Sequence, residues 1–532
     1  MTIMKKSILN IGMVCVLGLS LAACTDNFDS MNQDPMGITN SDPSYVMPYI
    51  QEQGAHIASW EYQVGDNLHT NLYAQYFANS ASYFNSDNYT YNSGWVTDGF
   101  WNNYYSGVLK QVKAVAETVK KLPAYDNIYQ TMRIYAASCT VMMTGVFGDV
   151  AYSGAATGRS DGKYDSQKDI YAAVFKELTE AAAALNSNKA DQAAYKDNQD
   201  LIYNGDLKKW VRLANSLRLR YALRLVYVDP ALAKQEGEAA LAATGGLLQS
   251  NDDNAGVYIS GTGANGWPLF QISGWGEFCM SKTMEDMLKT TSGVADPRMP
   301  LWFGHTNGST AENPEFKGIP NGLATSDLSN YPAEDRSYVW GLQAMPGWNS
   351  KNNSESSFCV PIRQKVMSYA EVCLLKAEAA LRGWNGAGDA KANYLAGIKA
   401  SFEAERAMVS DASLYSTAND NTYMTTGKVE WKGDADFETH LEQIITQKWL
   451  ALYPNGTEAW TEFRRTGYPK LTPVKVSMES TINAANGEFV KKLRYVDDEL
   501  RENPNASDKS LNGGKGDGMN VRVWWDAGNR YK

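Results

Sequence analysis

Cysteine and histidine, which metal centres and many catalytic sites need, are scarce in this sequence. The 532 residues include 6 cysteines and 4 histidines, with no C-x-x-C pair and no cluster of the two types. Few residues are available for a histidine-based metal site or a catalytic triad, so we expect neither a metal nor a cofactor. We interpret the cysteines of the body as small buried residues, while a disulfide between Cys359 and Cys373 stays open.

Basic charge and long apolar runs are scarce as well. Lys and Arg number 49 against 59 Asp and Glu, which gives a formal net charge of -10. Nucleic-acid binding needs a basic surface, so this balance argues against a nucleic-acid partner. Beyond the N-terminus no apolar run approaches the roughly 18 residues that a membrane-spanning helix requires.

The N-terminus has the parts of a secretory signal. Two lysines precede an apolar run at residues 8–21, which is too short to cross a bilayer, and an Ala-Ala pair precedes Cys24. A cysteine at this place predicts a lipoprotein signal peptide, residues 1–23, after which Cys24 carries the lipid. We interpret residues 24–43, which are polar and interrupted by prolines, as a lipidated tether that anchors the body to a membrane.

The body has the periodicity of helices that come in pairs. Apolar residues recur at spacings of three and four in paired segments at 108–146, 169–228, 368–403 and 437–465. Ser166 and Ser368 each stand three residues before an acidic residue, which is the spacing of a capping box, and Asp206 is placed to cap a further helix. These features predict an all-α fold with a tetratricopeptide-like helical-repeat scaffold, at about 106–245 and 366–466 of a domain spanning 44–532.

The stretch from 443 to 469 predicts a tight helical hairpin. The sequence Pro-Asn-Gly at 454–456 ends the first helix, and Thr457 stands where an N-cap would begin the second. Trp449 and Trp460 place an aromatic residue on each arm.

The helix expected at 206–225 carries arginines for which two roles are open. They could form a basic binding face, or they could lie over apolar neighbours and pair with carboxylates, and we favour the pairing. The residues are Arg212, Arg218, Arg220 and Arg224.

Two regions between the helices differ in composition. Residues 246–352 are dense in Gly, Asn, Ser, Pro and aromatic residues, with one convincing helix at 282–289. Residues 83–98 mix aromatic with polar side chains, show no sustained period and are expected to form a loop. Loops of such length in a compact protein are usually functional, so we expect ligand contacts there.

Several segments together resemble one family. The string K-W-L-A-L-Y-P-N-G-T-E-A-W-T-E-F-R-R-T-G-Y-P at 448–469 closely resembles a signature of the SusD/RagB nutrient-binding outer-membrane lipoproteins of Bacteroidetes. Similar motifs follow one another along the chain: N-Q-D-P at 32–35, G-D-V-A-Y-S-G-A at 148–155, Y-D-S-Q-K-D-I-Y at 164–171, K-W-V-R-L-A-N-S-L-R-L-R at 209–220, D-P-R at 296–298 and Y-A-E-V-C-L-L-K-A-E-A-A-L-R-G-W at 369–384. The sequence departs from the commoner pattern at Ala151, where a proline often stands.

The resemblance implies a function as well as a fold. It implies four tetratricopeptide-like helix pairs, a loop-rich ligand-binding region, exposure at the cell surface of the outer membrane, and a role as the lid of a SusC-like TonB-dependent transporter. Members of this kind bind a nutrient and deliver it to the transporter without catalysing a reaction. The expected ligand is an oligo- or polysaccharide.

A glycan presents hydroxyl groups and apolar C–H faces, so its binder needs flat aromatic surfaces flanked by polar groups. The two loop-rich regions supply this mixture. The expected ligand contacts are Tyr83, Asn88, Tyr89, Tyr91, Asn92, Trp95, Trp267, Trp275, Trp340 and Trp348.

Two other functions stay open from the sequence. Aromatic and amide side chains serve extended peptides as well as sugars, so a peptide-binding lid of the RagB kind is the alternative. A secreted helical glycoside hydrolase would need two carboxylates, for which Glu442 and Glu458 are candidates, and we consider this function less favoured.

Overall fold

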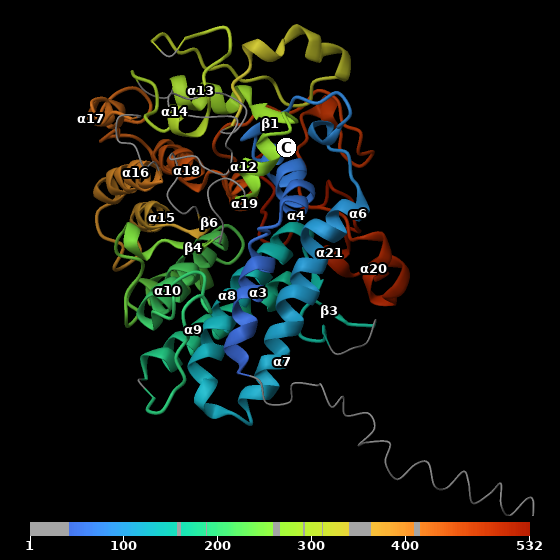
Figure 1. The fold of residues 1–532 in the computed structure, drawn as a ribbon, viewed down its shortest axis with the longest axis vertical. Coiled ribbons are helices and arrows are strands. Elements are labelled where there is room, and N and C mark those ends of the chain that lie inside the picture. Colours follow the sequence, from blue (N-terminus) through green and yellow to red (C-terminus); the bar gives the residue numbers. More distant parts are fainter. Residues whose placement is uncertain are drawn as a thin grey trace, which may run out of the picture. The chain divides into compact units, whose positions relative to one another are not determined.

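The computed structural model describes residues 42–156, 161–187, 189–258, 267–290, 293–310, 312–339, 363–408 and 415–531. The predicted signal peptide, Cys24 and nearly all of the tether therefore lie outside the described residues. Helices predominate in the described part (Figure 1), which confirms the all-α prediction. No described helix is long and apolar enough to cross a membrane.

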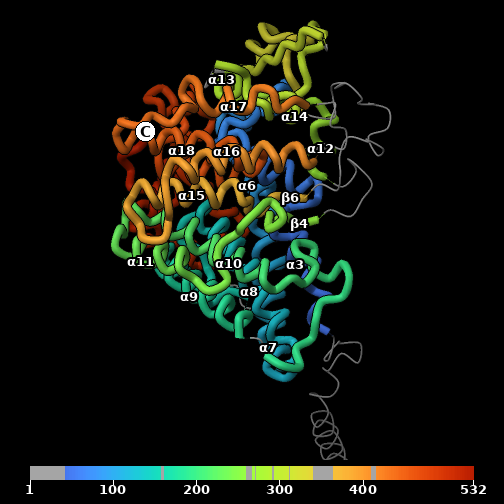
Figure 2. Tube along the Cα trace, turned by 90° about the vertical axis from the view of Figure 1, so that its left-hand side faces the viewer, coloured from blue at the N-terminus to red at the C-terminus, as the bar shows by residue number. Residues whose placement is uncertain are grey.

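The longest helices form the predicted pairs. They are α7 (Lys110–Val119) with α8 (Asp126–Phe147), α9 (Gln167–Asn186) with α10 (Leu207–Arg224), α15 (Tyr369–Leu381) with α16 (Ala390–Ala407), and α18 (Phe437–Leu452) with α19 (Gly456–Thr466). Members of each pair pack against each other, and α11 (Pro230–Leu241) packs on α10. In Figure 2, α15, α16 and α18 lie above α8, α9 and α10. The helical-repeat scaffold is confirmed.

Side-chain caps begin these helices where the sequence indicates. The Ser166 side chain accepts a hydrogen bond from the backbone N–H of Asp169, and Ser368 accepts one from Glu371. Asp206 accepts from two backbone N–H groups at the start of α10. Each cap satisfies backbone donors that have no partner within the helix.

The helical hairpin of α18 and α19 is present, but its second cap differs from the prediction. Asn455, not Thr457, caps α19, because its side chain accepts from the backbone N–H of Glu458. The hydroxyl of Thr457 bonds instead to Thr70, at 2.8 Å, and to Asp66, at 3.1 Å. Thr457 therefore joins the hairpin to the π-helical segment Gln63–Thr70.

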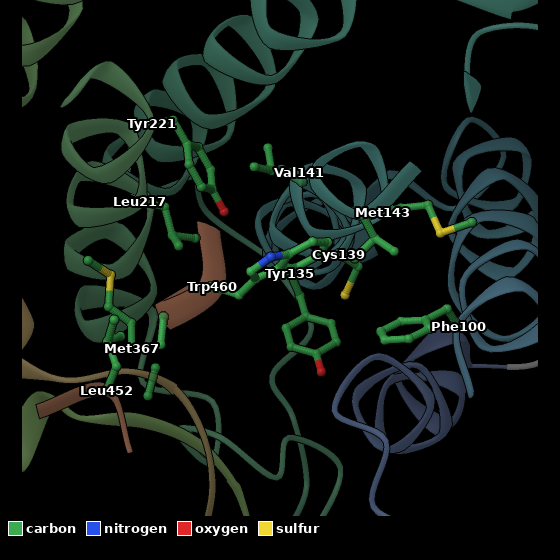
Figure 3. Packing of buried hydrophobic residues seen from close by; sticks show 14 of the residues in the cluster. Phe100, Tyr135, Cys139, Val141, Met143, Leu217, Tyr221, Met367, Leu452 and Trp460 are labelled. Carbon is green, nitrogen blue, oxygen red and sulfur yellow. The ribbon is translucent and has the colours of Figure 1, made fainter. Parts of the chain in front are cut away.

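One large hydrophobic cluster runs through much of the scaffold, beside a second cluster that includes residues of α16 and α18. Trp210, Trp449, Trp460 and Trp525 are all buried within the large cluster. Figure 3 shows Trp460 among side chains of α8 and α10. The hairpin therefore packs in the centre of the molecule.

The four arginines of α10 pair with carboxylates. Arg212 binds Asp253, Arg218 binds Glu236, Arg220 binds Glu371, and Arg224 binds Glu458. The pairing interpretation is confirmed. Because Arg220 and Arg224 are buried, these pairs tie α10 to α15 and α19 through the interior.

Short elements complete the described chain. The helices are α3 (Met47–Gly54), α4 (Ser59–Tyr62), α5 (Asn71–Tyr73), α6 (Ser93–Val96), α12 (Pro268–Ser273), α13 (Lys282–Thr290), α14 (Met299–Trp302), α17 (Asp420–Met424), α20 (Asp497–Glu502) and α21 (Leu511–Gly514). The strands pair antiparallel as β1 (Phe77–Asn79) with β5 (Phe278–Met280), β2 (Val150–Ala151) with β3 (Tyr164–Asp165), and β4 (Ala255–Tyr258) with β6 (Arg363–Met367).

Two loop predictions are corrected by these elements. The loop expected at 83–98 ends at Asn92, because α6 begins at Ser93 and continues into further helical turns. The region 246–352 holds α12 and α14 besides the predicted helix, which the structure extends as α13. Helices of four to six residues carry too few positions for a period to show in the sequence.

Candidate ligand-binding surface

A small sheet brings together two loops that are distant in the sequence. Asn79 of β1 pairs with Phe278 of β5, and the contact continues beyond the sheet. The Ser80 backbone N–H donates to the Glu277 carbonyl at 2.9 Å, and its hydroxyl donates to the Gly276 carbonyl at 2.8 Å. The loop after β1 and the turn before β5 therefore lie side by side.

The loop after β1 carries aromatic rings that contact one another. The Tyr83 ring lies 4.8 Å from that of Phe84, centroid to centroid, and Phe84 lies 5.7 Å from Trp95 in an edge-on contact. Tyr83 is 67% exposed. Trp95 is held on α6, whose first turn is capped by the Asn92 side chain, so Asn92 positions an aromatic residue.

The turn before β5 presents Trp275 and Glu277. Trp275 is 51% exposed, and Gly276 after it has a φ of 70°, a left-handed conformation that favours glycine. The Glu277 carboxylate accepts from the Tyr83 hydroxyl at 2.6 Å and from the Gln63 amide at 2.6 Å. This carboxylate fixes the Tyr83 side chain, and the hydrogen bond raises the pKa of the Tyr83 hydroxyl.

A third exposed aromatic residue comes from α4, which packs against α12. Trp60 is 48% exposed, and its indole N–H donates to Asp98 at 3.0 Å. The helix α4 also contacts the π-helical segment Thr97–Trp101, which follows α6. We call the side chains of Trp60, Tyr83, Phe84, Trp95 and Trp275 the aromatic face. Its polar neighbours are Gln63, Asp98 and Glu277.

Other predicted contacts in the first loop have structural roles. Asn88 and Tyr89 are buried, and the Asn88 amide donates to the carbonyls of Gly322 and Val476. The Tyr89 ring packs edge-on against Tyr73 at 5.8 Å. Their burial argues against ligand contact.

Tyr91 and Trp267 are engaged within the chain as well. The Tyr91 hydroxyl donates to the Tyr495 carbonyl at 3.0 Å, and Trp267 is buried with its indole N–H donating to Gln364. Neither belongs to the aromatic face. Trp340 and Trp348 lie outside the described residues.

The sequence did not single out five residues of this surface. Trp60, Gln63, Phe84, Asp98 and Glu277 all contribute to it. Phe84 and Glu277 stand next to or near predicted residues, so their position was a usable signal. The other three fall in helical turns, where nothing in the spacing distinguishes an exposed side chain from a core side chain.

A separate cavity of about 820 Å³ lies between the segments 197–204, 251–258 and 363–370. Its lining includes the carboxylate of Asp200, which already accepts from Gln51, Trp210 and Gly205. None of the predicted ligand contacts lines it. We assign it no ligand.

The residues named as candidates for metal binding, disulfide formation or hydrolysis lie apart in the structure or outside its described part. They contain no group of three or more His, Cys, Asp or Glu side chains that could hold a metal ion. Cys139, Cys279 and Cys373 are free and buried, and Cys359 lies outside the described residues. Glu458, a hydrolase candidate, is held by the buried Arg224, and Glu442 lines a different pocket.

The fold is that of a helical-repeat protein, and it presents an exposed aromatic surface on short connecting elements. Residues 30–526 match the SusD-like family, described as "Susd and RagB outer membrane lipoprotein". The chain therefore belongs to the SusD-like family of outer membrane lipoproteins. No curated protein matches the chain.

Solved structures of family members superpose along nearly the whole chain. A chitin-binding SusD homologue from Flavobacterium johnsoniae is 30% identical, with a TM-score of 0.75, covering 91% of this chain and 98% of that one. A structure described as a chitin-binding protein is 28% identical, with a TM-score of 0.73, covering 91% and 100%. A SusD homologue from Bacteroides vulgatus is 27% identical, with a TM-score of 0.74, covering 92% and 98%.

Proposed function

We propose that this lipoprotein binds oligosaccharide on its aromatic face and delivers it to a SusC-like TonB-dependent transporter. The observation that carries the proposal is the gathering of Trp60, Tyr83 and Trp275, each about half exposed or more, around hydrogen-bonded carboxylates. Large aromatic side chains left in water cost free energy, and in a soluble protein such groups usually mark a binding surface.

The chemistry of the face suits a sugar. Aromatic rings offer flat apolar surfaces to the C–H faces of a pyranose, and the carboxylates of Asp98 and Glu277 accept hydrogen bonds from hydroxyl groups. The similarity to chitin-binding members of the family supports a glycan over a peptide. We propose a non-catalytic role, because the candidate Glu458 is held by the buried Arg224 and the candidate Glu442 lines a different pocket.

The location and the partner complete the proposal. Acylation at Cys24 would anchor the protein in the outer membrane, with the body exposed at the cell surface and the residues after Cys24 as the tether. Because the transporter would share the ligand, the lipoprotein alone need not bind tightly, and we expect a Kd weaker than about 1 μM.

The test is a pull-down from outer membranes through a tag after Lys532, with mass spectrometry of retained proteins and small molecules. Co-purification of a large β-barrel protein with a bound oligosaccharide is the expected result. A retained peptide would favour the alternative of a peptide-binding, RagB-like protein. Release of reducing ends from polysaccharide by the purified protein would show catalysis. A Cys24→Ser variant should leave the membrane fraction, and its retention there would contradict the anchor.

A further inference from the structure

The two segments that build the aromatic face contain no basic residue. Between residues 43 and 109, and again between 235 and 281, the sequence has neither Lys nor Arg. The first segment supplies Trp60, Tyr83 and Trp95, and the second supplies Trp275. In a chain with 49 basic residues, these two stretches supply no cation to the surface that they build.

Acidic side chains do occur at this surface. Glu277 is half-buried beneath Tyr83, Asp98 is half-buried beside Trp60, and Glu61 follows Trp60 on α4. Among the described Lys and Arg side chains, none forms an ion pair with Glu277 or Asp98. Within the described part of the chain, both carboxylates therefore lack a basic partner.

Arg336, a described basic residue that approaches this region, is engaged within the chain. Arg336 donates to the Ser80 carbonyl at 3.2 Å, but it is buried. Its guanidinium also donates to the carbonyls of Tyr331 and Leu328. The guanidinium of Arg336 is therefore engaged by main-chain oxygens of the protein.

Three hydrogen-bond donors of the face and its polar neighbours are used internally. The Tyr83 hydroxyl and the Gln63 amide both donate to Glu277, and the Trp60 indole donates to Asp98. The carboxylate oxygens of Glu277 and Asp98 still have lone pairs that a ligand can use. A carboxylate accepts hydrogen bonds and does not donate them. A ligand group that bonds to either carboxylate must bring a donor, such as a hydroxyl, acetamido N–H or ammonium group.

We propose that the aromatic face takes neutral or cationic glycans and rejects anionic ones, such as uronate-bearing or sulfated chains. This inference rests on the proposed function and names the ligand class of the same site. A sugar carboxylate or sulfate brings acceptors where donors are needed, and it places a like charge near Glu277 and Asp98. Like charges opposed in an interface reduce affinity and favour the neutral competitor. Salt weakens this repulsion, because the Debye length falls from about 10 Å at 0.1 M to about 3 Å at 1 M.

The experiment uses the full-length lipoprotein purified in detergent. A glycan array containing neutral, amino and acidic glycans is probed first, and we expect the bound members to be neutral or cationic. Binding confined to acidic glycans would overturn the charge rule and leave the proposed function standing. An array without any bound glycan would overturn the proposed function and this inference with it.

Matched probes then test the effect of negative charge on the ligand. A neutral oligosaccharide bound on the array is compared with its C6-oxidised form, in which carboxylates replace the C6 hydroxymethyl groups. At 50 mM salt we expect the oxidised form to bind at least tenfold more weakly, and at 500 mM salt we expect this ratio to shrink at least threefold. Equal or tighter binding of the oxidised form at 50 mM salt contradicts the inference.

Paired variants locate the effect. The double variant Glu277→Gln with Asp98→Asn should reduce the neutral-to-oxidised ratio at least threefold at 50 mM salt. Glu117→Gln, which removes an exposed carboxylate on α7, is the control and should leave the ratio unchanged. A folded double variant, judged by its melting curve, that keeps the full ratio would show that these carboxylates do not set the preference.

Discussion

The hydroxyl of Tyr83 donates to Oε1 of Glu277 at 2.6 Å, although 194 residues separate the two along the chain. The sheet of β1 and β5 makes this contact possible, because its two strands lead directly into the loops that carry the pair. The hydrogen bond raises the pKa of Tyr83, so the phenol stays protonated and keeps donating at neutral pH. The aromatic face is therefore one surface assembled from two parts of the sequence.

Removing an aromatic side chain from the face should weaken ligand binding. Trp60→Ala, Tyr83→Ala and Trp275→Ala should each lower affinity for the bound oligosaccharide by roughly 1–2 kcal/mol, or about 5- to 30-fold, as expected for central aromatic contacts. Calorimetry measures the change. Tyr45→Ala is the control, because Tyr45 is 64% exposed but lies outside the face. A folded Trp275→Ala protein with the affinity of the Tyr45→Ala control would argue against the face as the site.

A side chain at Gly456 should destabilise the fold. A Cβ there would lie 2.1 Å from Asn71 Oδ1 and 2.7 Å from the Asn71 backbone, while the Gly456 N–H donates to that same Oδ1. Gly456→Ala should therefore cost about 3 kcal/mol or more of unfolding free energy, as severe overpacking does. Gly433→Ala is the matched control, since nothing lies within 4 Å of its Cβ. Equal melting temperatures for the two variants would contradict this prediction.

Loss of Arg465 should leave buried carboxylates without their main partner. Its guanidinium binds both oxygens of Glu378 at 2.7 Å and bonds to Glu462, and all three residues are buried. Arg465→Met keeps much of the volume but should destabilise the protein by about 3–5 kcal/mol. Lys120→Met, which removes an exposed pair with Glu117, should change stability by less than about 1 kcal/mol. Thermal melting of both variants measures the loss of stability. An Arg465→Met protein as stable as the wild type would contradict the prediction and show that the carboxylates rearrange.

Asp87 should make stability depend on pH. Burial raises the pKa of its carboxyl to about 6, although Asn79 and Asn321 donate to it. A group with a raised folded pKa binds its proton more tightly in the folded state, so its contribution to stability is full below pH about 4 and is lost as pH rises through 6. Relative to Asp87→Asn, the wild type should lose roughly 2 kcal/mol of unfolding free energy between pH 4 and 7.

Denaturant unfolding across this pH range measures the Asp87 effect. Asp434→Asn, at an exposed position, serves as control and should follow the wild type. Parallel curves for the wild type and Asp87→Asn would mean that the carboxyl titrates normally.

The helical scaffold was predictable because its signals are local. Ser166, Asp206 and Ser368 each stand beside the backbone groups that they cap, and the apolar spacing of the long helices reflects one buried face. Thr457 shows the limit of such signals. Its hydroxyl could cap a helix, but Asn455, two positions earlier, caps α19 instead. The Thr457 hydroxyl makes a tertiary contact with Thr70.

The ligand surface was predictable only in part. Tyr83 and Tyr89 lie in one loop of similar composition, yet the first is exposed and the second is packed against Tyr73. Without a period, the sequence gives no rule for which ring faces water. The sheet that brings Trp275 to Tyr83 has only three paired positions, too few to be recognised from β-propensity.

The three residue pairs between β1 and β5 also join the two halves of the binding surface. This ladder is far shorter than any of the long helices, so we expect its amides to open locally more often than theirs. A ligand stacked on both halves would hold this ladder closed. Deuterium uptake at the amides of β1 and β5 would then slow on ligand binding. The exchange rate of these amides would therefore show whether the surface is occupied.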